Sequence, residues 1–179
     1  MIEIRWHGRG GQGAFTAAKL LGAAIVCGEK KYALSFPSFG PERRGAPIQA
    51  FTKIDDVPVI NRTEIKKCDF LVFLDDTLFS KEAMNDLKIG GKVLINSSNA
   101  SKYSQYPEII TIDATTLSQE ILGAPITNTA MLGALLGISD LCKQVSVEQI
   151  LPDYLSEKIV AKNIAIINRS YNKIKEARA

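Results

Sequence analysis

The sequence has few of the side chains that hold metals and redox centres. Its 179 residues include one histidine, His7, and three cysteines, Cys27, Cys68 and Cys142. The cysteines lie far apart, form no C-x-x-C pair and are odd in number, which favours reduced, buried thiols over disulfides. Because no metal-ligand spacing is present, we expect no iron–sulfur cluster, haem or zinc bound by this chain alone.

Long hydrophobic runs and a strong charge are also missing. No apolar run approaches the roughly 20 residues that a membrane-spanning helix needs, and no signal peptide precedes the first predicted strand. The net charge of +3 is too small and too scattered for a nucleic-acid site. With 46% hydrophobic and 23% charged residues, the composition predicts one folded cytoplasmic domain over residues 1–179, with no membrane or nucleic-acid partner.

What the sequence does contain is a glycine-rich turn near its start. The turn, His7–Gly13, follows a predicted strand at Ile2–Trp6 and precedes a predicted helix at Ala14–Val26. It carries the spacing G-x-G-x-x-G at Gly8, Gly10 and Gly13. In this context the backbone N–H groups and the helix dipole favour a phosphate or another anion, although a turn kept for packing alone is the alternative.

Short apolar strands alternate with helices over most of the chain. Strands are predicted at Tyr32–Phe36, Ile48–Ile54, Asp69–Asp75, Lys92–Asn96 and Ile109–Asp113. Helices are predicted at Phe79–Leu87 and Thr116–Leu122, with a turn at Gly90-Gly91. The continuous apolar run inside the strand at Asp69–Asp75 is typical of a parallel strand buried on both faces. The pattern predicts a doubly wound, mostly parallel α/β sheet with helices on both faces, a Rossmann-like fold.

The C-terminal third is predicted to be helical. Asn128–Leu141 is apolar on all sides, which predicts a buried helix, and Gly133 and Gly137 would let a neighbour approach closely. Ser146 and Gln149 have the spacing of a capping box. The last helix carries an apolar stripe at Val160, Ile164, Ile167, Tyr171 and Ile174. This stripe packs either on the domain's own sheet or against a partner.

Several polar residues are candidates for completing an anion site. Arg9 lies inside the turn, and Gln12 offers an amide at the start of the helix. Arg43 and Arg44 lie on a proline-rich loop, Pro37–Pro47, that we expect at the same edge of the sheet. A solvated pair of arginines is the alternative for this loop.

Neither a nicotinamide site nor a catalytic centre is favoured. The second predicted strand ends at Ser35-Phe36-Pro37 without the acidic residue that would hold the ribose of NAD. His7 is interpreted as a neutral structural histidine, because no motif places a carboxylate or nucleophile beside it. Asp75 and Asp76 are interpreted as helix N-caps. We therefore predict no catalytic residue.

Three motifs in order along the chain resemble one known family. They are Gly8-Arg-Gly-Gly-Gln-Gly13 followed by Thr16-Ala-Ala18, then Pro37-Ser-Phe-Gly-Pro-Glu-Arg-Arg-Gly45, then Asn128-Thr-Ala-Met-Leu-Gly133. Together they resemble the gamma subunit of 2-oxoacid:ferredoxin oxidoreductases, of which pyruvate:ferredoxin oxidoreductase (pyruvate synthase) is the best-known member. The resemblance extends over about the whole chain.

The resemblance implies a subunit that is not catalytic alone. In this family, alpha, beta and delta partner subunits complete a heterotetramer, and thiamine diphosphate and iron–sulfur clusters lie in the partners. The complex converts a 2-oxoacid and coenzyme A to acyl-CoA and CO2, and it reduces ferredoxin. By resemblance, the backbone of Gly8, Gly10, Gly11 and Gly13 would hold the phosphates of coenzyme A, with Arg9, Gln12, Arg43 and Arg44 as further contacts. The loop Pro37–Gly45 would border the catalytic subunits.

Two questions stay open at this level. Pyruvate is the expected substrate, with 2-oxoglutarate, branched-chain oxoacids and indolepyruvate as alternatives. A free-standing nucleotide- or coenzyme A-binding module is the alternative to a subunit.

Overall fold

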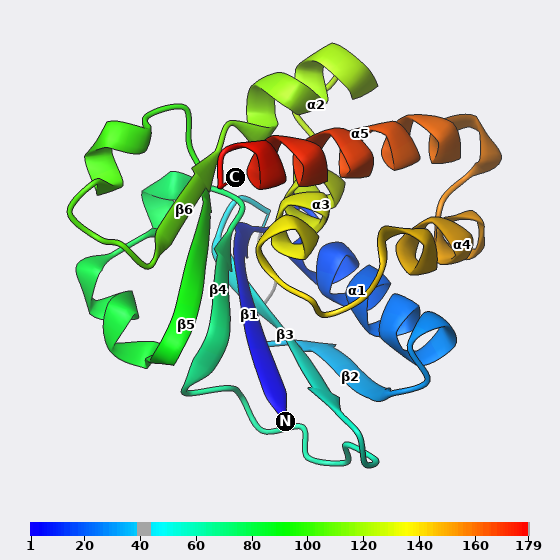
Figure 1. The fold of residues 1–179 in the computed structure, drawn as a ribbon, viewed down its shortest axis with the longest axis horizontal. Coiled ribbons are helices and arrows are strands. Elements are labelled where there is room, and N and C mark those ends of the chain that lie inside the picture. The colour runs from blue at the N-terminus through cyan, green and yellow to red at the C-terminus, as the bar shows by residue number, and fades with distance from the viewer. Residues whose placement is uncertain (39–43, 179) are drawn as a thin grey trace.

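A twisted six-stranded sheet runs through the molecule, in the order β2-β3-β1-β4-β5-β6 (Figure 1). The computed structural model describes residues 1–38 and 44–178. The strands are β1 (Ile2–Arg9), β2 (Tyr32–Pro37), β3 (Pro47–Asp55), β4 (Cys68–Phe73), β5 (Leu87–Asn96) and β6 (Ile109–Ile112). Only β3 runs antiparallel to its two neighbours, and the pairs β1–β4, β4–β5 and β5–β6 are parallel. The predicted mostly parallel α/β sheet is therefore confirmed.

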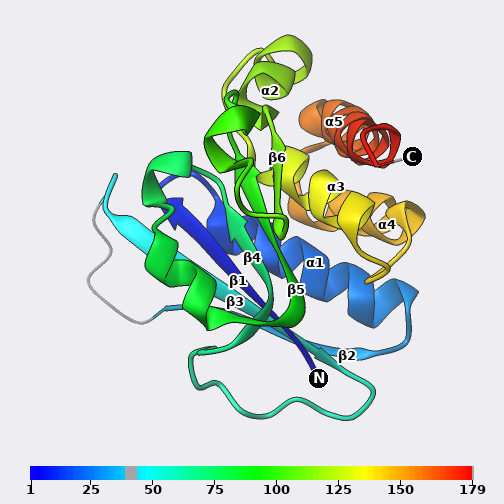
Figure 2. The same cartoon turned by 60° about the vertical axis from the view of Figure 1, so that its left-hand side comes forward.

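Different kinds of helix cover the two faces of the sheet (Figures 1 and 2). The α-helices gather on one face: α1 (Ala14–Gly28), α2 (Ala114–Leu122), α3 (Asn128–Ile138), α4 (Gln144–Tyr154) and α5 (Glu157–Glu176). The other face carries the short 3-10 helices η1 (Asp76–Leu78), η2 (Lys81–Asp86) and η3 (Ala100–Tyr103). The α-helix expected at Phe79–Leu87 is thus a 3-10 helix, η2. Its six residues leave a thinner layer on this face.

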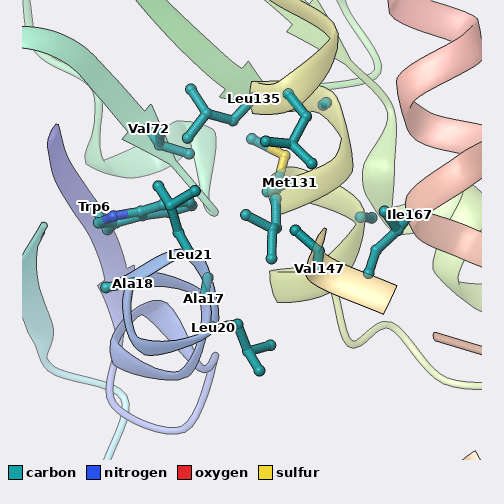
Figure 3. Close-up of a cluster of buried hydrophobic side chains, with 14 of the residues drawn as sticks. Trp6, Ala17, Ala18, Leu20, Leu21, Val72, Met131, Leu135, Val147 and Ile167 are labelled. Atoms are coloured by element: carbon teal, nitrogen blue, oxygen red, sulfur yellow. The ribbon is translucent and has the colours of Figure 1, made fainter. Parts of the chain in front are cut away.

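Each face of the sheet has its own hydrophobic core. On the α-helical face, Trp6 of β1 and Val72 of β4 pack with Leu21 and Met131 (Figure 3). On the other face, Phe73 belongs to a second cluster beneath the 3-10 helices. Because alternate residues of β4 enter the two cores, its apolar run is continuous in sequence.

Helix α3 lies between the sheet layer and α5, and all its residues are buried. A Cβ at Gly133 would overlap the backbone of Ile167 on α5, and one at Gly137 would lie 3.0 Å from the Tyr171 carbonyl oxygen. The two glycines therefore permit the close approach that the sequence predicted. The apolar stripe of α5, with Ile167 and Ile174 at its buried centre, packs within the domain, against α3 rather than directly on the sheet.

The turn predicted at Gly90-Gly91 was wrong, because both residues lie inside β5. Gly90 has φ +79°, a left-handed conformation that glycine adopts without strain. The register between β4 and β5 shifts here, as in a β-bulge. A local irregularity thus interrupts the ladder, and the strand continues through it.

The predicted capping box at Ser146 was also wrong. Lys143 is the N-cap of α4 and makes no side-chain cap. Instead, the Ser146 hydroxyl and the Lys143 N–H both donate to the Glu29 carboxylate, at 2.8 and 2.9 Å. A long-range contact between α1 and α4 replaces the local one. Of the three thiols, which the sequence predicted to be buried, Cys27 is exposed.

Candidate functional site

The glycine turn begins later than the sequence indicated. Antiparallel pairing with β3 continues to the pair Arg9–Pro47, so β1 extends through Arg9. The turn is then fastened to the end of the proline-rich loop by two backbone hydrogen bonds. The Gly10 N–H donates to the Ala46 carbonyl at 2.9 Å, and the Gly45 N–H donates to the Gly10 carbonyl at 3.1 Å. The turn itself is therefore Gly10–Gly13, held against residues 45–46.

The start of α1 is open to a ligand. Gly13, the N-cap, has φ +80° and makes no side-chain cap, and Gly11 is exposed with φ +97°. Both angles lie in the region that glycine adopts without strain. The first N–H groups of a helix have no partner within the helix, so an uncapped N-terminus offers its donors and its dipole to an anion.

The side chains of Arg9 and Gln12 are engaged with Asp75, the residue after β4. The Arg9 guanidinium donates to the Asp75 carboxylate at 2.9 Å and to the Thr77 hydroxyl at 2.9 Å. Gln12 accepts from the Arg9 N–H at 2.7 Å and donates to Asp75 at 3.2 Å. Burial raises the pKa of Asp75, but hydrogen bonds from the Thr77 hydroxyl and N–H, and then from Gln12 and Arg9, outweigh it and hold the pKa below its ordinary value. Asp75 is therefore ionised at neutral pH, and a phosphate at the turn would share Arg9 with it.

Of the two candidate arginines on the loop, Arg44 is among the residues that the structure describes. Arg44 is exposed and directly precedes Gly45, so its backbone lies beside the glycine turn. The structure thus brings Arg44 to the edge of the sheet where the sequence placed it. Arg43 lies outside the described residues.

A polar crevice of about 510 Å3 lies beside the turn, at the carboxyl ends of β4, β5 and β6. Its lining includes Gln12, Asp75, Asp76, Asn96, Asp113 and Thr127. In sheets of this kind, ligands bind in the crevice outside the carboxyl ends of the strands. Apart from Gln12, Asp75 and Asp76, sequence reasoning missed these residues. The one signal for Asn96 and Asp113 was a polar residue at the end of an apolar strand, and Thr127 had none.

The two adjacent aspartates have different roles. Asp75 is the N-cap of η1 and accepts from the Thr77 N–H, which confirms its interpretation as a cap. Asp76 is the first residue of η1, and its carboxylate accepts instead from the Ser97 hydroxyl at 2.9 Å. Asp76 therefore connects the ends of β4 and β5 at the crevice and is not a helix cap.

His7 lies on the other face of the sheet, where it lines a separate cavity of about 910 Å3. Its ring stacks on Phe73 at 4.2 Å and accepts a hydrogen bond from the Arg5 Nε at 3.1 Å. Burial, helped by the Arg5 charge, lowers the pKa of His7 to about 3. His7 is thus neutral near pH 7, as expected of a structural histidine.

Two further features bear on cofactors and membranes. Within residues 1–38 and 44–178, no three His, Cys, Asp or Glu side chains come together as metal ligands would. Every helix found in those ranges is too short or too polar to span a bilayer.

A mostly parallel sheet, an open glycine turn at its first crossover and a polar crevice at the strand ends define the Rossmann-like class of α/β ligand-binding domains. The family description for pyruvate ferredoxin/flavodoxin oxidoreductases matches residues 3–173. The chain therefore belongs to the pyruvate ferredoxin/flavodoxin oxidoreductase family, as its three motifs predicted.

Several relatives match this chain over nearly their whole length. The pyruvate/ketoisovalerate oxidoreductases common subunit gamma of Thermococcus litoralis is 43% identical over 180 residues, covering 97% of both chains. Pyruvate synthase subunit PorC of Methanothermobacter marburgensis is 43% identical over 178 residues, covering 99% of both. The crystal structure of pyruvate oxidoreductase subunit PORC from Thermotoga maritima superposes with a TM-score of 0.82, at 31% identity, over 96% of this chain and 95% of that one. The family assignment thus places the chain among the subunits of an oxidoreductase.

Proposed function

We propose that this chain is the gamma subunit of a cytoplasmic pyruvate:ferredoxin oxidoreductase. The complex would convert pyruvate and coenzyme A to acetyl-CoA and CO2 and pass the electrons to ferredoxin. Alpha, beta and delta subunits would carry thiamine diphosphate and the iron–sulfur clusters. The names of relatives that match the chain from end to end support the subunit role. This chain would contribute the site for the phosphates of coenzyme A and a surface for its partners.

The uncapped start of α1 is the observation that carries the coenzyme A proposal. Gly11 is exposed in the turn that leads into this helix start, and Gln12 of the same turn lines the crevice. A diphosphate is the part of coenzyme A that such an N-terminus binds. Arg44, exposed beside the turn, adds a positive charge. Arg9 would add a second charge once a phosphate competes with Asp75 for it.

Replacement of Gly11 by valine tests this proposal in the purified complex. A β-branched residue at φ +97° is strained by about 1–3 kcal/mol, so the turn should change its conformation. We expect the apparent affinity for coenzyme A to fall by about tenfold or more, which titration calorimetry would measure.

Gly90→Val is the matched control for this experiment. Gly90 has φ +79° and open space around it, as Gly11 does, but it lies within β5, apart from the turn. It should therefore suffer the same strain without a change in coenzyme A affinity. Wild-type affinity in the Gly11→Val complex would contradict a phosphate site at the turn.

We propose pyruvate as the substrate because two relatives that are 43% identical to this chain carry pyruvate in their names. One of those names describes a gamma subunit common to pyruvate and ketoisovalerate oxidoreductases, which supports a choice of oxoacid made by other subunits. Turnover of the native complex with a panel of 2-oxoacids tests this assignment. A higher kcat/KM for 2-oxoglutarate, a branched-chain oxoacid or indolepyruvate would replace pyruvate.

A further inference from the structure

We infer that the exposed face of α5 binds an acidic surface on another subunit of the complex. The inference rests on the proposed function, because it gives the chemistry of a partner that the proposal requires. Four cations on this face are separated by four, seven and four residues, the spacing of one side of a helix. All four are exposed, and they form a basic stripe made of Lys158, Lys162, Arg169 and Lys173. Helix α5 lies on the outer side of α3, so the stripe is accessible to a partner (Figure 2).

The positive charge of the chain is concentrated in this helix and the residues after it. Residues 157–179 contain six of the 22 lysines and arginines but only two of the 19 aspartates and glutamates. This segment therefore carries a charge of +4, while residues 1–156 carry −1. A single side of the molecule thus produces the electrostatic attraction for an acidic partner.

The basic stripe lowers the stability of its own helix. Lys158 and Lys162 are like charges four residues apart, and so are Arg169 and Lys173, an arrangement that destabilises a helix. Lys158 is also the second residue of α5, at the positive end of the helix dipole, where a cation is unfavourable. Only Lys173, in the last turn, is well placed for the dipole.

Nothing that the structure describes of this chain compensates for that repulsion. The ion pairs found within residues 1–38 and 44–178 involve other cations, and none includes a member of the basic stripe. Carboxylates from outside the chain would remove the repulsion and supply the missing ion pairs. The repulsion within the helix is therefore an indication of an acidic partner that is independent of the total charge.

The shape of the stripe favours a protein surface over other anions. Its ends, Lys158 and Lys173, are about 22 Å apart along the helix axis, too far for one small anion to reach both. The apolar face of α5 is buried against α3, so the helix has no apolar face left to enter a bilayer. A nucleic acid is disfavoured because the rest of the chain is not basic. A second copy of the chain would bring like charges together.

Charge reversal at two positions, Lys162→Glu with Arg169→Glu, tests the inference in the assembled complex. Each change places opposite charges four residues apart on α5, so the purified chain should not become less stable to chemical denaturation. The same changes put carboxylates against an acidic partner. We expect the apparent dissociation constant of this chain from the complex to rise by about tenfold or more. Size-exclusion chromatography of diluted complex would measure it.

Arg62→Glu with Lys66→Glu is the matched control, because it reverses one arginine and one lysine that are also exposed. Both lie on the loop between β3 and β4, away from α5, and assembly should not change. If the α5 variant assembles like this control, or if it is less stable to denaturation than the wild type, the inference is overturned. Failure of the proposed function looks different, because the wild-type chain itself would then not copurify with oxidoreductase subunits.

Amine acylation of the wild-type complex identifies what covers the stripe. The amines of Lys158, Lys162 and Lys173 should react several times more slowly than that of the exposed Lys66, as mass spectrometry of peptides would show. Carbodiimide should cross-link the same three amines to aspartates or glutamates of another subunit. Reaction as fast as that of Lys66 would overturn the inference. Protection that is lost on nuclease treatment, or only when bound lipid is removed, would also overturn it.

Discussion

The two cavities on either side of the sheet differ in how completely their polar groups are satisfied. The larger cavity, of about 910 Å3, has partners for its buried Arg5 and His7 side chains. There the buried Arg5 pairs with Asp86 at 2.6 Å and donates to His7, which is neutral. The smaller crevice, of about 510 Å3, lies beside the uncapped start of α1. Free backbone donors at a helix start, rather than volume, therefore mark the candidate ligand site.

Mutations at the two places should therefore differ in whether they change stability or ligand binding. Changes around His7 should alter the free energy of unfolding and leave ligand affinity intact. Changes at the glycine turn should alter ligand affinity, except at Gly13, where the turn is packed against Asn128. Gly13 therefore offers the largest expected effect.

Gly13→Ala should destabilise the chain by about 2–3 kcal/mol. A Cβ at Gly13 would lie 2.6 Å from the Asn128 Nδ2, and the φ of +80° is unfavourable for alanine. Chemical denaturation of the purified chain would measure the loss. Gly123→Ala is the matched control, since Gly123 has φ +77° with nothing nearby and should lose only the dihedral part, about 1 kcal/mol. Equal losses in both variants would show that Asn128 does not constrain the turn.

His7 should make stability depend on pH. The pKa of His7 is about 3 in the folded chain and about 6.5 in the unfolded chain. Below pH 6.5 the unfolded chain therefore binds a proton at His7 that the folded chain does not bind. This contribution is fully present above pH 6.5 and is lost as the pH falls towards 3. At pH 4.5 the loss should reach roughly 2–3 kcal/mol.

His7→Phe tests this pH dependence, because phenylalanine can keep the stacking on Phe73 without taking up a proton. Its unfolding free energy should fall less between pH 7 and pH 4.5 than that of the wild type. Identical pH profiles would show that His7 is protonated in the folded chain. Coenzyme A affinity at pH 7 should not change, since His7 lies on the other face of the sheet from the turn.

The sequence predicted the fold where the signal was regular. The run at residues 70–74 fixed β4 as a strand buried on both faces, and the all-apolar segment from Asn128 predicted α3. Predictions failed where a tertiary contact outweighed a local pattern. Glu29 takes up Ser146, which was expected to cap its own helix, and pairing with β4 carries β5 through Gly90.

The candidate site was only partly visible in the sequence. The glycine turn has a motif, so its residues were found. The crevice is built from single polar residues on separate elements, such as Asp113 after β6 and Thr127 before α3. No spacing along the chain connects these two residues, and only the fold brings them together. The pairing of Arg9 with Asp75 depends likewise on the parallel neighbours β1 and β4.

Arg44→Ala should have the smallest effect, a weakening of coenzyme A binding by about threefold in the purified complex. An exposed arginine beside the turn contributes well under 1 kcal/mol to holding a phosphate, and salt screens that contribution. Arg62→Ala is the matched control, because Arg62 is also exposed, on the loop between β3 and β4 at the opposite end of the strands. Calorimetric titration at low and high salt should show a shallower salt dependence for Arg44→Ala alone. If both variants bind coenzyme A alike, Arg44 is a solvated surface residue, and the amides of α1 hold the phosphates without it.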